Sequence, residues 1–360
     1  MMDQEMEKEG KMEKLVGSYT REEIFSQSAA WKAALQILQD TATELQGLVG
    51  SGYTQVIFTG CGSTYYLSLA GAALLQGLTG LPSRGLPASE VWLNPDLYLR
   101  KGERALLVAV SRSGETTETL RACATFRLGR YGDILTFSCY PERALASAGK
   151  VNVVLPSGQE ESVAQTRAFS TLYLGTLYLA ALQAQRQDIL QALPDLADAC
   201  SQMLGTYANV VEKVGSDLDL ERFYFLGSAY RYGLACELSL KMKEMTLSHS
   251  EPFHFMEFRH GPMSMITPQT LVTGLLSRMN RENEVAVLAD MRKLGAQVLV
   301  VGSELGDVTA AYKIEIPAAS DELALLPLYL PLMQLMAFHR SLAKGLNPDL
   351  PNNLSPVVFL

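Results

Sequence analysis

The sequence predicts an α/β protein made of two similar units, each of them a parallel sheet flanked by helices. Two observations support this fold class. Short apolar strands alternate with helical stretches, which is the pattern of a parallel sheet covered by helices, and the same series of elements occurs twice. A chain of 360 residues is also longer than one hydrophobic core usually supports, so two domains are expected.

Both series run strand, helix, strand, helix, strand. The first is expected at residues 55–60, 63–76, 105–110, 115–127 and 133–138. The second is expected at residues 222–227, 231–247, 271–276, 281–294 and 297–302. The strands are short apolar runs, as is typical of strands buried on both faces of a parallel sheet.

The spacing and one aligned segment suggest a duplication. Gly60 and Ser111 are 51 residues apart, and Gly227 and Ser277 are 50 residues apart. SRSGETTE, which begins at Ser111, aligns without gaps with SRMNRENE, which begins at Ser277 and has lost the glycine and most hydroxyls. We interpret the chain as a duplicated unit in which only the first copy keeps the hydroxyl loop. Chance similarity between two α/β halves is the alternative.

The expected domain organisation follows from the two series. An Ala-, Leu- and Gln-rich stretch between them predicts a helical linker, and an apolar stretch at 323–345 predicts a closing helix. The N-terminus is a charged run without the apolar core of a signal peptide, so we interpret it as a flexible tail or a solvated helix. The expected divisions are a tail at 1–20, the first unit at 21–177, the linker at 178–215, the second unit at 216–345 and a C-terminal tail at 346–360.

Composition and charge argue against several classes of function. The formal net charge of −8 is unlike that of a general nucleic-acid-binding protein, although a local basic cluster could still bind phosphate. The five cysteines show no paired spacing, so we expect a reducing compartment and no thiol metal site. No apolar run reaches the roughly 18 residues that a membrane span needs. We therefore expect a cytoplasmic protein with no nucleic-acid or membrane partner.

A cluster of hydroxyl side chains follows the second expected strand. Ser111, Ser113, Thr116 and Thr117 surround Gly114 where the strand gives way to a helix. Ligands bind at such strand ends, and the free N–H groups of the following helix attract anions. The cluster therefore predicts a site for a phosphate monoester, with a simple helix cap as the alternative. The pattern GxxxxGK[ST] is absent, so nucleotide hydrolysis is not expected.

A shorter loop, GCGST at 60–64, follows the first expected strand. Gly62 permits close approach of a ligand, and Ser63 and Thr64 offer hydroxyls. The loop is weak evidence alone, and Tyr65 stands where a dinucleotide-binding GxGxxG pattern needs glycine.

Candidate acid–base residues lie in the second half. Glu237, Lys241 and Glu244 share one face of the helix expected at 231–247. His260 is followed by glycine and proline, which would hold its imidazole at a fixed angle. A carboxylate and an imidazole that converge on a phosphosugar could move protons. The alternative is a surface stripe of salt bridges. The three histidines of this region have no spacing that suggests a metal site.

Together these motifs resemble the double sugar-isomerase (SIS) domain family, in particular the isomerase half of glutamine–fructose-6-phosphate aminotransferase and stand-alone SIS-type glucosamine-6-phosphate deaminases. The similarity runs from about residue 21 to residue 358. It implies flavodoxin-like three-layer units and a homodimer with a shared active site. The motifs that carry it are GCGST, SRSGETTETL, ESVAQTRAFST, ELSLKMKE, EFRHGP and FHRSLAKGLNPDLP.

The resemblance implies roles for the matching residues. Glu244 would be the base that moves a proton between C1 and C2, assisted by Lys241, and His260 would assist ring opening from the partner subunit. Residues implied to bind the phosphate are Ser111, Arg112, Ser113, Thr116, Ser63 and Thr64. Residues implied to contact the sugar are Gly62, Val163, Gln165 and Glu237.

The chain departs from the aminotransferase pattern at several points. Arg112 stands where the aminotransferase has glutamine, and Gln165 stands where it has serine. Pro356 occupies the position of the lysine that forms an imine with the keto sugar. The chain begins MMDQ, and no N-terminal glutaminase with a catalytic cysteine is expected.

The resemblance implies an isomerase or deaminase acting on an amino-sugar phosphate, such as glucosamine 6-phosphate to fructose 6-phosphate plus ammonia or the reverse. No cofactor or metal is expected. The deaminating direction is favoured because no glutaminase would supply ammonia. Fructosamine-6-phosphate deglycase and tagatose- or galactosamine-6-phosphate isomerase remain alternatives. A non-catalytic phosphosugar sensor is an alternative of another class, and it would need neither Glu244 nor His260.

Overall fold

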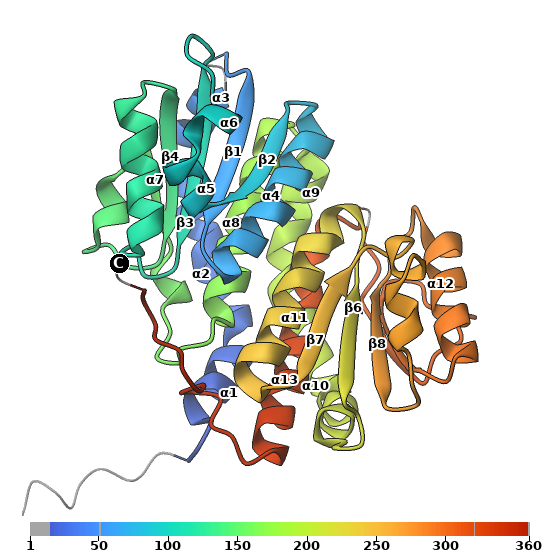
Figure 1. The fold of residues 1–360 in the computed structure, drawn as a ribbon. Helices are drawn as coiled ribbons and strands as arrows, with labels where there is room; N and C mark the ends of the chain where they lie inside the picture. The colour runs from blue at the N-terminus through green and yellow to red at the C-terminus, as the bar shows by residue number, and fades with distance from the viewer. Residues whose placement is uncertain (1–14, 50–51, 320, 359–360) are drawn as a thin grey trace, which may run out of the picture.

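The computed structural model describes residues 15–49, 52–319 and 321–358, and it shows two α/β units packed side by side (Figure 1). The first unit is drawn in blue and green and the second in yellow and orange, with α4 of the first unit packed against α11 of the second. Each unit contains a five-stranded sheet in which all strand pairs are parallel. The expected fold class is confirmed. The charged run at 1–14 lies outside the described residues.

The two sheets have the same topology. The first has the order β2-β1-β3-β4-β5, with bounds Ser83–Pro87, Gln55–Gly60, Ala105–Ser111, Gly132–Ser138 and Val151–Val154. The second has the order β7-β6-β8-β9-β10, with bounds His249–Phe253, Arg222–Leu226, Thr270–Leu275, Gln297–Gly302 and Tyr312–Glu315. The orders correspond strand for strand, since β6 takes the place of β1 and β8 that of β3. This correspondence supports the inferred duplication.

Thirteen α-helices lie along the described part of the chain. They are α1 (Ser18–Phe25), α2 (Gln27–Asp40), α3 (Ala42–Val49), α4 (Ser63–Thr79), α5 (Ala88–Leu93), α6 (Pro95–Tyr98), α7 (Thr117–Leu128), α8 (Arg167–Gln183), α9 (Gln187–Ala192), α10 (Leu196–Ser216), α11 (Tyr232–Thr246), α12 (Arg281–Lys293) and α13 (Pro331–Ala343).

One large core joins the two units. Alternate residues of a strand point to opposite faces of its sheet, so Phe58 of β1 enters the large core, while its neighbour Ile57 enters a smaller core beneath α5 and α7. In the second sheet Phe223 enters the same large core, while Tyr224 enters a separate core beneath α12. The inner faces of both sheets therefore share their packing, which fixes the two units relative to each other.

Two helical segments differ from the sequence-based expectation. The boundary expected at residue 177 falls inside α8, and the expected linker at 178–215 continues through α9 and α10, whose apolar side chains join the large core. The expected closing helix at 323–345 begins only at Pro331, after a 3₁₀ turn at Leu326–Tyr329. Proline is accepted in the first turn of a helix but not in its interior, so the helix starts at this residue.

Candidate active site

The two polar loops identified in the sequence lie next to each other, at the carboxyl ends of neighbouring strands of the first sheet. The loop at 60–64 follows β1, and the loop at 111–117 follows β3, its neighbour. In this sheet β2 lies beside β1 on the side away from β3, and β4 lies beside β3 on the side away from β1. The chain after β1 and the chain after β3 therefore run in opposite directions across the sheet. This reversal of strand order is where open α/β sheets bind ligands.

The hydroxyl groups after β3 converge on one another. Ser111 Oγ lies 3.2 Å from Thr116 Oγ1 and 3.4 Å from Ser113 Oγ, and the last two oxygens are 3.4 Å apart. Gly114 has a φ of 69°, a conformation that glycine adopts without strain, and its N–H donates to Ser111 Oγ at 3.1 Å. Thr116 occupies the N-cap position of α7, but its side chain makes no capping bond. Simple helix capping therefore does not explain this cluster.

Arg112 belongs to the same loop, but its guanidinium has other partners. Its side chain is 6% exposed and donates to the carbonyl of Ser162 at 3.1 Å and to the carbonyl of Pro356 at 3.2 Å. It also forms an ion pair with the buried Glu160 at 3.4 Å. The role implied for Arg112 in phosphate binding stays a prediction, and in this structure its guanidinium fastens the C-terminal segment to the loop.

The loop after β1 divides its two hydroxyl residues between different tasks. Gly62 has a φ of 55° and a ψ of −123°, and α4 begins at the next residue, Ser63. Thr64 Oγ1 accepts from the N–H of Cys61 and donates to its carbonyl, both at 2.9 Å, so it closes the turn. Ser63 Oγ instead accepts a hydrogen bond from Lys241 of the second unit at 3.1 Å. Ser63 thus links this loop to the candidate acid–base group.

Glu237, Lys241 and Glu244 form a largely buried group on α11. Lys241 Nζ lies 2.5 Å from Glu244 Oε2 and 3.4 Å from Glu237 Oε1. The side chains of Glu237 and Lys241 are 0% and 1% exposed, and that of Glu244 is 21% exposed. A surface stripe of salt bridges is therefore excluded. Of the three residues, Glu244 alone reaches solvent, as a base that contacts a substrate must.

Burial changes the protonation of this group. It raises the pKa of Glu237 to about 8, although the nearby Lys241 acts in the opposite direction. Burial would lower the pKa of Lys241, but the two carboxylates outweigh it and the pKa of Lys241 is raised. Near neutral pH the lysine therefore stays charged, while Glu237 binds a proton readily.

The other expected site residues are not all brought into this group. Val163 is nearly buried in the segment before α8, and its N–H donates to the carbonyl of Asp349 at 3.0 Å. Gln165 lies two residues further, and its buried Oε1 has no hydrogen-bond partner among the described residues. His260 follows a short 3₁₀ turn and is exposed at the surface of the second unit.

Sequence reasoning missed the residues that hold the segment around Val163. Asp349 Oδ1 accepts from the N–H and the hydroxyl of Thr20 at 2.8 and 2.7 Å, so it holds the first turn of α1. Glu23 of α1 accepts from the N–H groups of Glu161 and Ser162 at 2.6 and 3.1 Å. These bonds join elements more than 130 residues apart, which no local pattern in the sequence signals.

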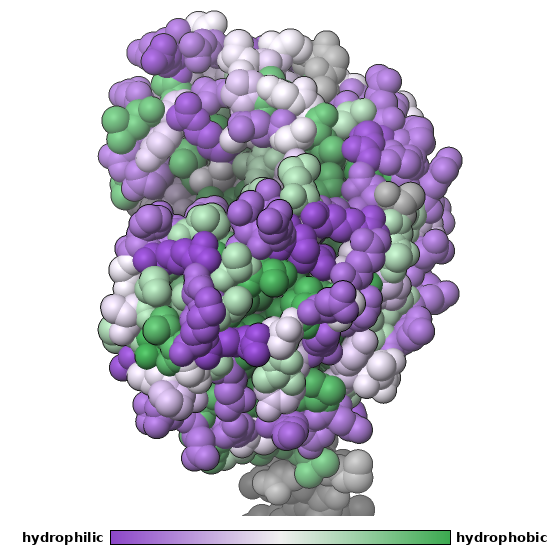
Figure 2. Space-filling model, turned by 90° about the vertical axis from the view of Figure 1, so that its right-hand side faces the viewer, coloured by the Kyte–Doolittle hydropathy of each residue, from purple (hydrophilic) through white to green (hydrophobic). Residues whose placement is uncertain are grey.

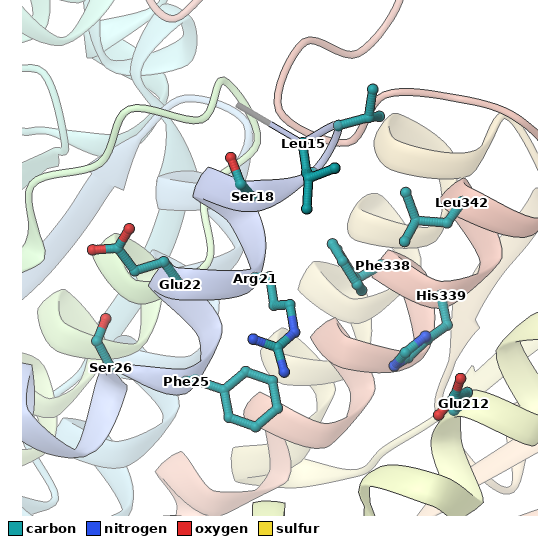
Figure 3. Close-up of a pocket in the computed structure, with 12 residues that line it drawn as sticks. Leu15, Ser18, Arg21, Glu22, Phe25, Ser26, Glu212, Phe338, His339 and Leu342 are labelled. Atoms are coloured by element: carbon teal, nitrogen blue, oxygen red, sulfur yellow. The ribbon is translucent and has the colours of Figure 1, made fainter. Parts of the chain in front are cut away.

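Two hollows lie in different parts of the molecule. A pocket of about 260 Å³ opens beside the hydroxyl loop and is lined by Arg112, Ser113, Glu160 and Pro356 among others. A larger pocket of about 750 Å³ lies between α1 and α13, where Phe25 and Phe338 form much of its apolar wall (Figure 3). The smaller hollow adjoins the hydroxyl cluster, whereas the larger one is lined mainly by hydrocarbon.

Two kinds of feature are absent from the described residues. No group of three or more His, Cys, Asp or Glu side chains in this part of the chain could hold a metal ion. No helix in the same part is long and apolar enough to cross a membrane.

The fold and the site together define a double α/β protein with a hydroxyl-lined loop at the sheet edge and a buried carboxylate–lysine group beside it. The family model described as SIS domain matches residues 52–182 and 219–343, which is more than half of the chain. The chain belongs to the SIS domain family, as the sequence motifs predicted.

Curated relatives include two aminotransferases. Glutamine–fructose-6-phosphate aminotransferase [isomerizing] of Methanothermobacter thermautotrophicus is 26% identical over 332 residues, which cover 89% of this chain and 55% of the relative. The protein of the same description from Symbiobacterium thermophilum is 29% identical over 365 residues, with coverages of 93% and 58%. The chain thus spans a little over half the length of these relatives.

Solved structures with the same fold include two enzymes of other descriptions. Tagatose-6-phosphate ketose/aldose isomerase from Escherichia coli has a TM-score of 0.85 at 25% identity, covering 95% of this chain and 96% of that one. Glucosamine-6-phosphate deaminase from Thermotoga maritima has a TM-score of 0.76 at 26% identity, covering 95% of this chain and 100% of that one.

Proposed function

We propose that the protein is a sugar-phosphate isomerase of SIS type that acts on an amino-sugar phosphate, with glucosamine 6-phosphate as the first candidate substrate. The observation that carries this proposal is the contact between the two halves of the site. Lys241 touches Glu244 at 2.5 Å and Ser63 at 3.1 Å, so the acid–base group of the second unit lies against a polar loop of the first. The hydroxyl cluster follows the neighbouring strand.

The phosphate would be bound by Ser111, Ser113 and Thr116. Their hydroxyls lie 3.2–3.4 Å apart at the start of α7, whose free N–H groups favour an anion. Binding the dianion there fixes one end of the sugar, so that its carbonyl end can reach a group on another element.

Glu244 would then transfer the proton. In open-chain glucosamine 6-phosphate it would take the C2 proton and return it to C1. The C1 oxygen gains a proton and the C2 amine loses one, so the aldehyde and amine become a C1 alcohol and a C2 imine. Water adds to that imine, and ammonia leaves as fructose 6-phosphate forms. Lys241 keeps a positive charge beside the carboxylate and would stabilise the negative charge that develops on the enolate oxygen.

His260 would assist ring opening from a second copy of the chain. It is exposed in the single chain, and Met256 and Met265, four residues before it and five after it, are about half exposed. Figure 2 shows hydrophobic residues gathered within a hydrophilic surround on the side of the molecule that it displays. Exposed apolar groups of this kind mark interaction surfaces, and we propose a homodimer with a shared active site.

The decisive experiment is a substrate panel. The purified protein would be incubated with hexose, hexosamine and fructosamine 6-phosphates, and ammonia release and ketose formation would be followed together. Turnover of glucosamine 6-phosphate with equal yields of ammonia and ketose supports the proposal. Turnover of tagatose 6-phosphate without ammonia would instead favour the second candidate, which the likeness to the Escherichia coli isomerase supports. Tight binding without turnover of any sugar would indicate a sensor.

A further inference from the structure

The loop after β8 in the second unit is the structural counterpart of the hydroxyl loop. Ser277 follows β8 as Ser111 ends β3, and β8 holds the same place in its sheet as β3. The turns also share a hydrogen bond. The N–H of Asn280 donates to Ser277 Oγ at 3.0 Å, as the N–H of Gly114 donates to Ser111 Oγ at 3.1 Å. The two loops therefore share the same position in their sheets and the same turn hydrogen bond.

A carboxylate of the chain itself lies in the second loop. Glu284, in the first turn of α12, accepts from the N–H of Ser277 at 2.6 Å and from its hydroxyl at 2.9 Å. Glu284 is 2% exposed. In the first loop the aligned residue, Glu118, makes no such contact: one of its oxygens is buried without a hydrogen-bond partner among the described residues, and Ser111 faces other hydroxyls.

A second carboxylate completes this arrangement. Glu322 Oε2 accepts from the N–H of Arg278 at 2.8 Å and forms an ion pair with the buried Arg231 at 2.8 Å. Arg231 in turn donates to the hydroxyl of Tyr329 at 3.0 Å. Two successive N–H groups of the loop, at 277 and 278, are thus bound to carboxylates from the protein.

We propose that the second loop is an anion site occupied from within, in which the carboxylate of Glu284 takes the place that a ligand's phosphate takes in the first loop. Loops before helix N-termini bind anions through free N–H groups and hydroxyls, and an aspartate or glutamate side chain can meet the same demand. Met279 and Glu282 also replace the residues aligned with Ser113 and Thr116, so the second loop offers few free hydroxyls. The chain then binds one phosphate, although it contains two such loops.

The test removes the internal carboxylate in a background where the first loop cannot bind. Ser113→Ala with Thr116→Val disables the first loop, and Glu284→Ala is added to it. Inorganic phosphate is the probe, and the thermal unfolding midpoint is the readout. The combined variant should unfold at a lower temperature than its background, and phosphate tenfold above its dissociation constant should raise its midpoint by about 2–4 °C. The background alone should show no such rise.

Glu282→Ala is the matched control, because it removes an exposed glutamate from the same turn of α12. It should not create a response to phosphate. A combined variant that folds but ignores phosphate would overturn the proposal, as would a response that persists after Ser277→Ala.

Equilibrium dialysis of the unmodified protein gives an independent measurement, which stands even if the variants fail to fold. One phosphate per chain supports the inference, and two would refute it. The reading of the first loop rests on the proposed function and can fail separately. In that case Ser113→Ala with Thr116→Val would leave phosphate binding by the unmodified protein unchanged, while the Glu284→Ala experiment would still decide the second loop.

Discussion

At the scale of single residues, Glu244 is a carboxylate with one side towards a buried lysine and the other towards solvent. Replacing it with glutamine keeps the shape but removes the proton acceptor. We expect Glu244→Gln to lower kcat by about 100- to 10,000-fold, the usual contribution of a positioned base, with little change in KM. Steady-state kinetics on the sugar phosphate that the panel identifies would measure this. Glu282→Gln, on an exposed turn, is the control, and full activity of Glu244→Gln would remove Glu244 from the mechanism.

Glu237 should make stability depend on pH. Its pKa is 4.5 in an exposed setting and about 8 in the folded protein, so between these values the folded state holds a proton that the unfolded chain releases. The stabilisation is complete below pH 4.5 and is lost as the pH rises towards 8. Glu237→Gln should flatten this decline in the free energy of unfolding by about 2–4 kcal/mol. Urea unfolding at pH 5 and pH 8.5 would test it.

Glu23 also contributes to the decline in the free energy of unfolding as the pH rises. Burial raises its pKa to about 7, so it adds a decline of the same sign that ends at a lower pH. The Glu237→Gln variant should keep that part of the slope. An unchanged slope between pH 7 and pH 8.5 in this variant would show that Glu237 does not carry the proton.

The sequence predicts best those contacts that join residues close together in the chain. The convergence of Ser111, Ser113 and Thr116 could be predicted because all three lie within six residues at the end of one strand. Arg112 could not be placed in this way, because its partners, Ser162 and Pro356, lie 50 and 244 positions away in the chain. The burial of the Glu237 side chain could not be predicted from the sequence either, because helical spacing is compatible with both a surface stripe and a buried group.

At the scale of elements, the segment before α8 is held by contacts from both ends of the described chain. Asp349 binds the first turn of α1 through its carboxylate and Val163 through its carbonyl. Asp349→Asn removes the charge from these bonds, and we expect a loss of about 1–3 kcal/mol in unfolding free energy. Hydrogen exchange should become faster in α1 and around Val163.

Asp307→Asn is the control for this variant, since Asp307 is exposed. Equal stability of the Asp349 variant and the control would contradict the assigned role. Faster exchange spread over the whole chain, rather than confined to α1 and the segment near Val163, would show a general loss of stability instead of a released contact.

The central strands of both units could be predicted, and the edge strands could not. β3 is fully buried, so its apolar run is plain in the sequence. β7 reads HSEPF and is mostly part-exposed at the end of its sheet, so its polar residues and proline conceal a strand. Proline is tolerated at such edges because it need not donate to a neighbour. The same physical difference explains the missed β2 and β10, whose sequences SRGLP and YKIE also carry polar residues at a partly exposed edge.

At the scale of the whole molecule, the inferred duplication accounts for the position of the proposed active site between the two units. In the proposed site each unit supplies a different part: the first supplies the hydroxyl loop, and the second supplies Glu237, Lys241 and Glu244 on α11. Because α11 packs against α4 and both helices belong to the shared core, the two halves of the site are held at a fixed separation. The spacing of motifs in the sequence predicted the repeat. The shared core could be recognised only from the packing in the structure.

The proposed homodimer makes a prediction about mixtures of inactive variants. If Glu244 of one chain works with His260 of the partner, Glu244→Gln and His260→Ala are each inactive alone. Random mixing of equal amounts makes half of the dimers mixed, and each mixed dimer has one site with both residues intact. Unfolding and refolding the two together should therefore restore about one quarter of unmodified activity per chain.

Size and activity need to be measured on the same samples. Light scattering should give twice the chain mass for both variants and for the mixture. Refolding each variant separately and then adding them without exchange should restore nothing, which separates complementation from residual activity. If the jointly refolded dimers stayed inactive, His260 would act within its own chain or not at all, and the exposed methionines beside it would need another partner.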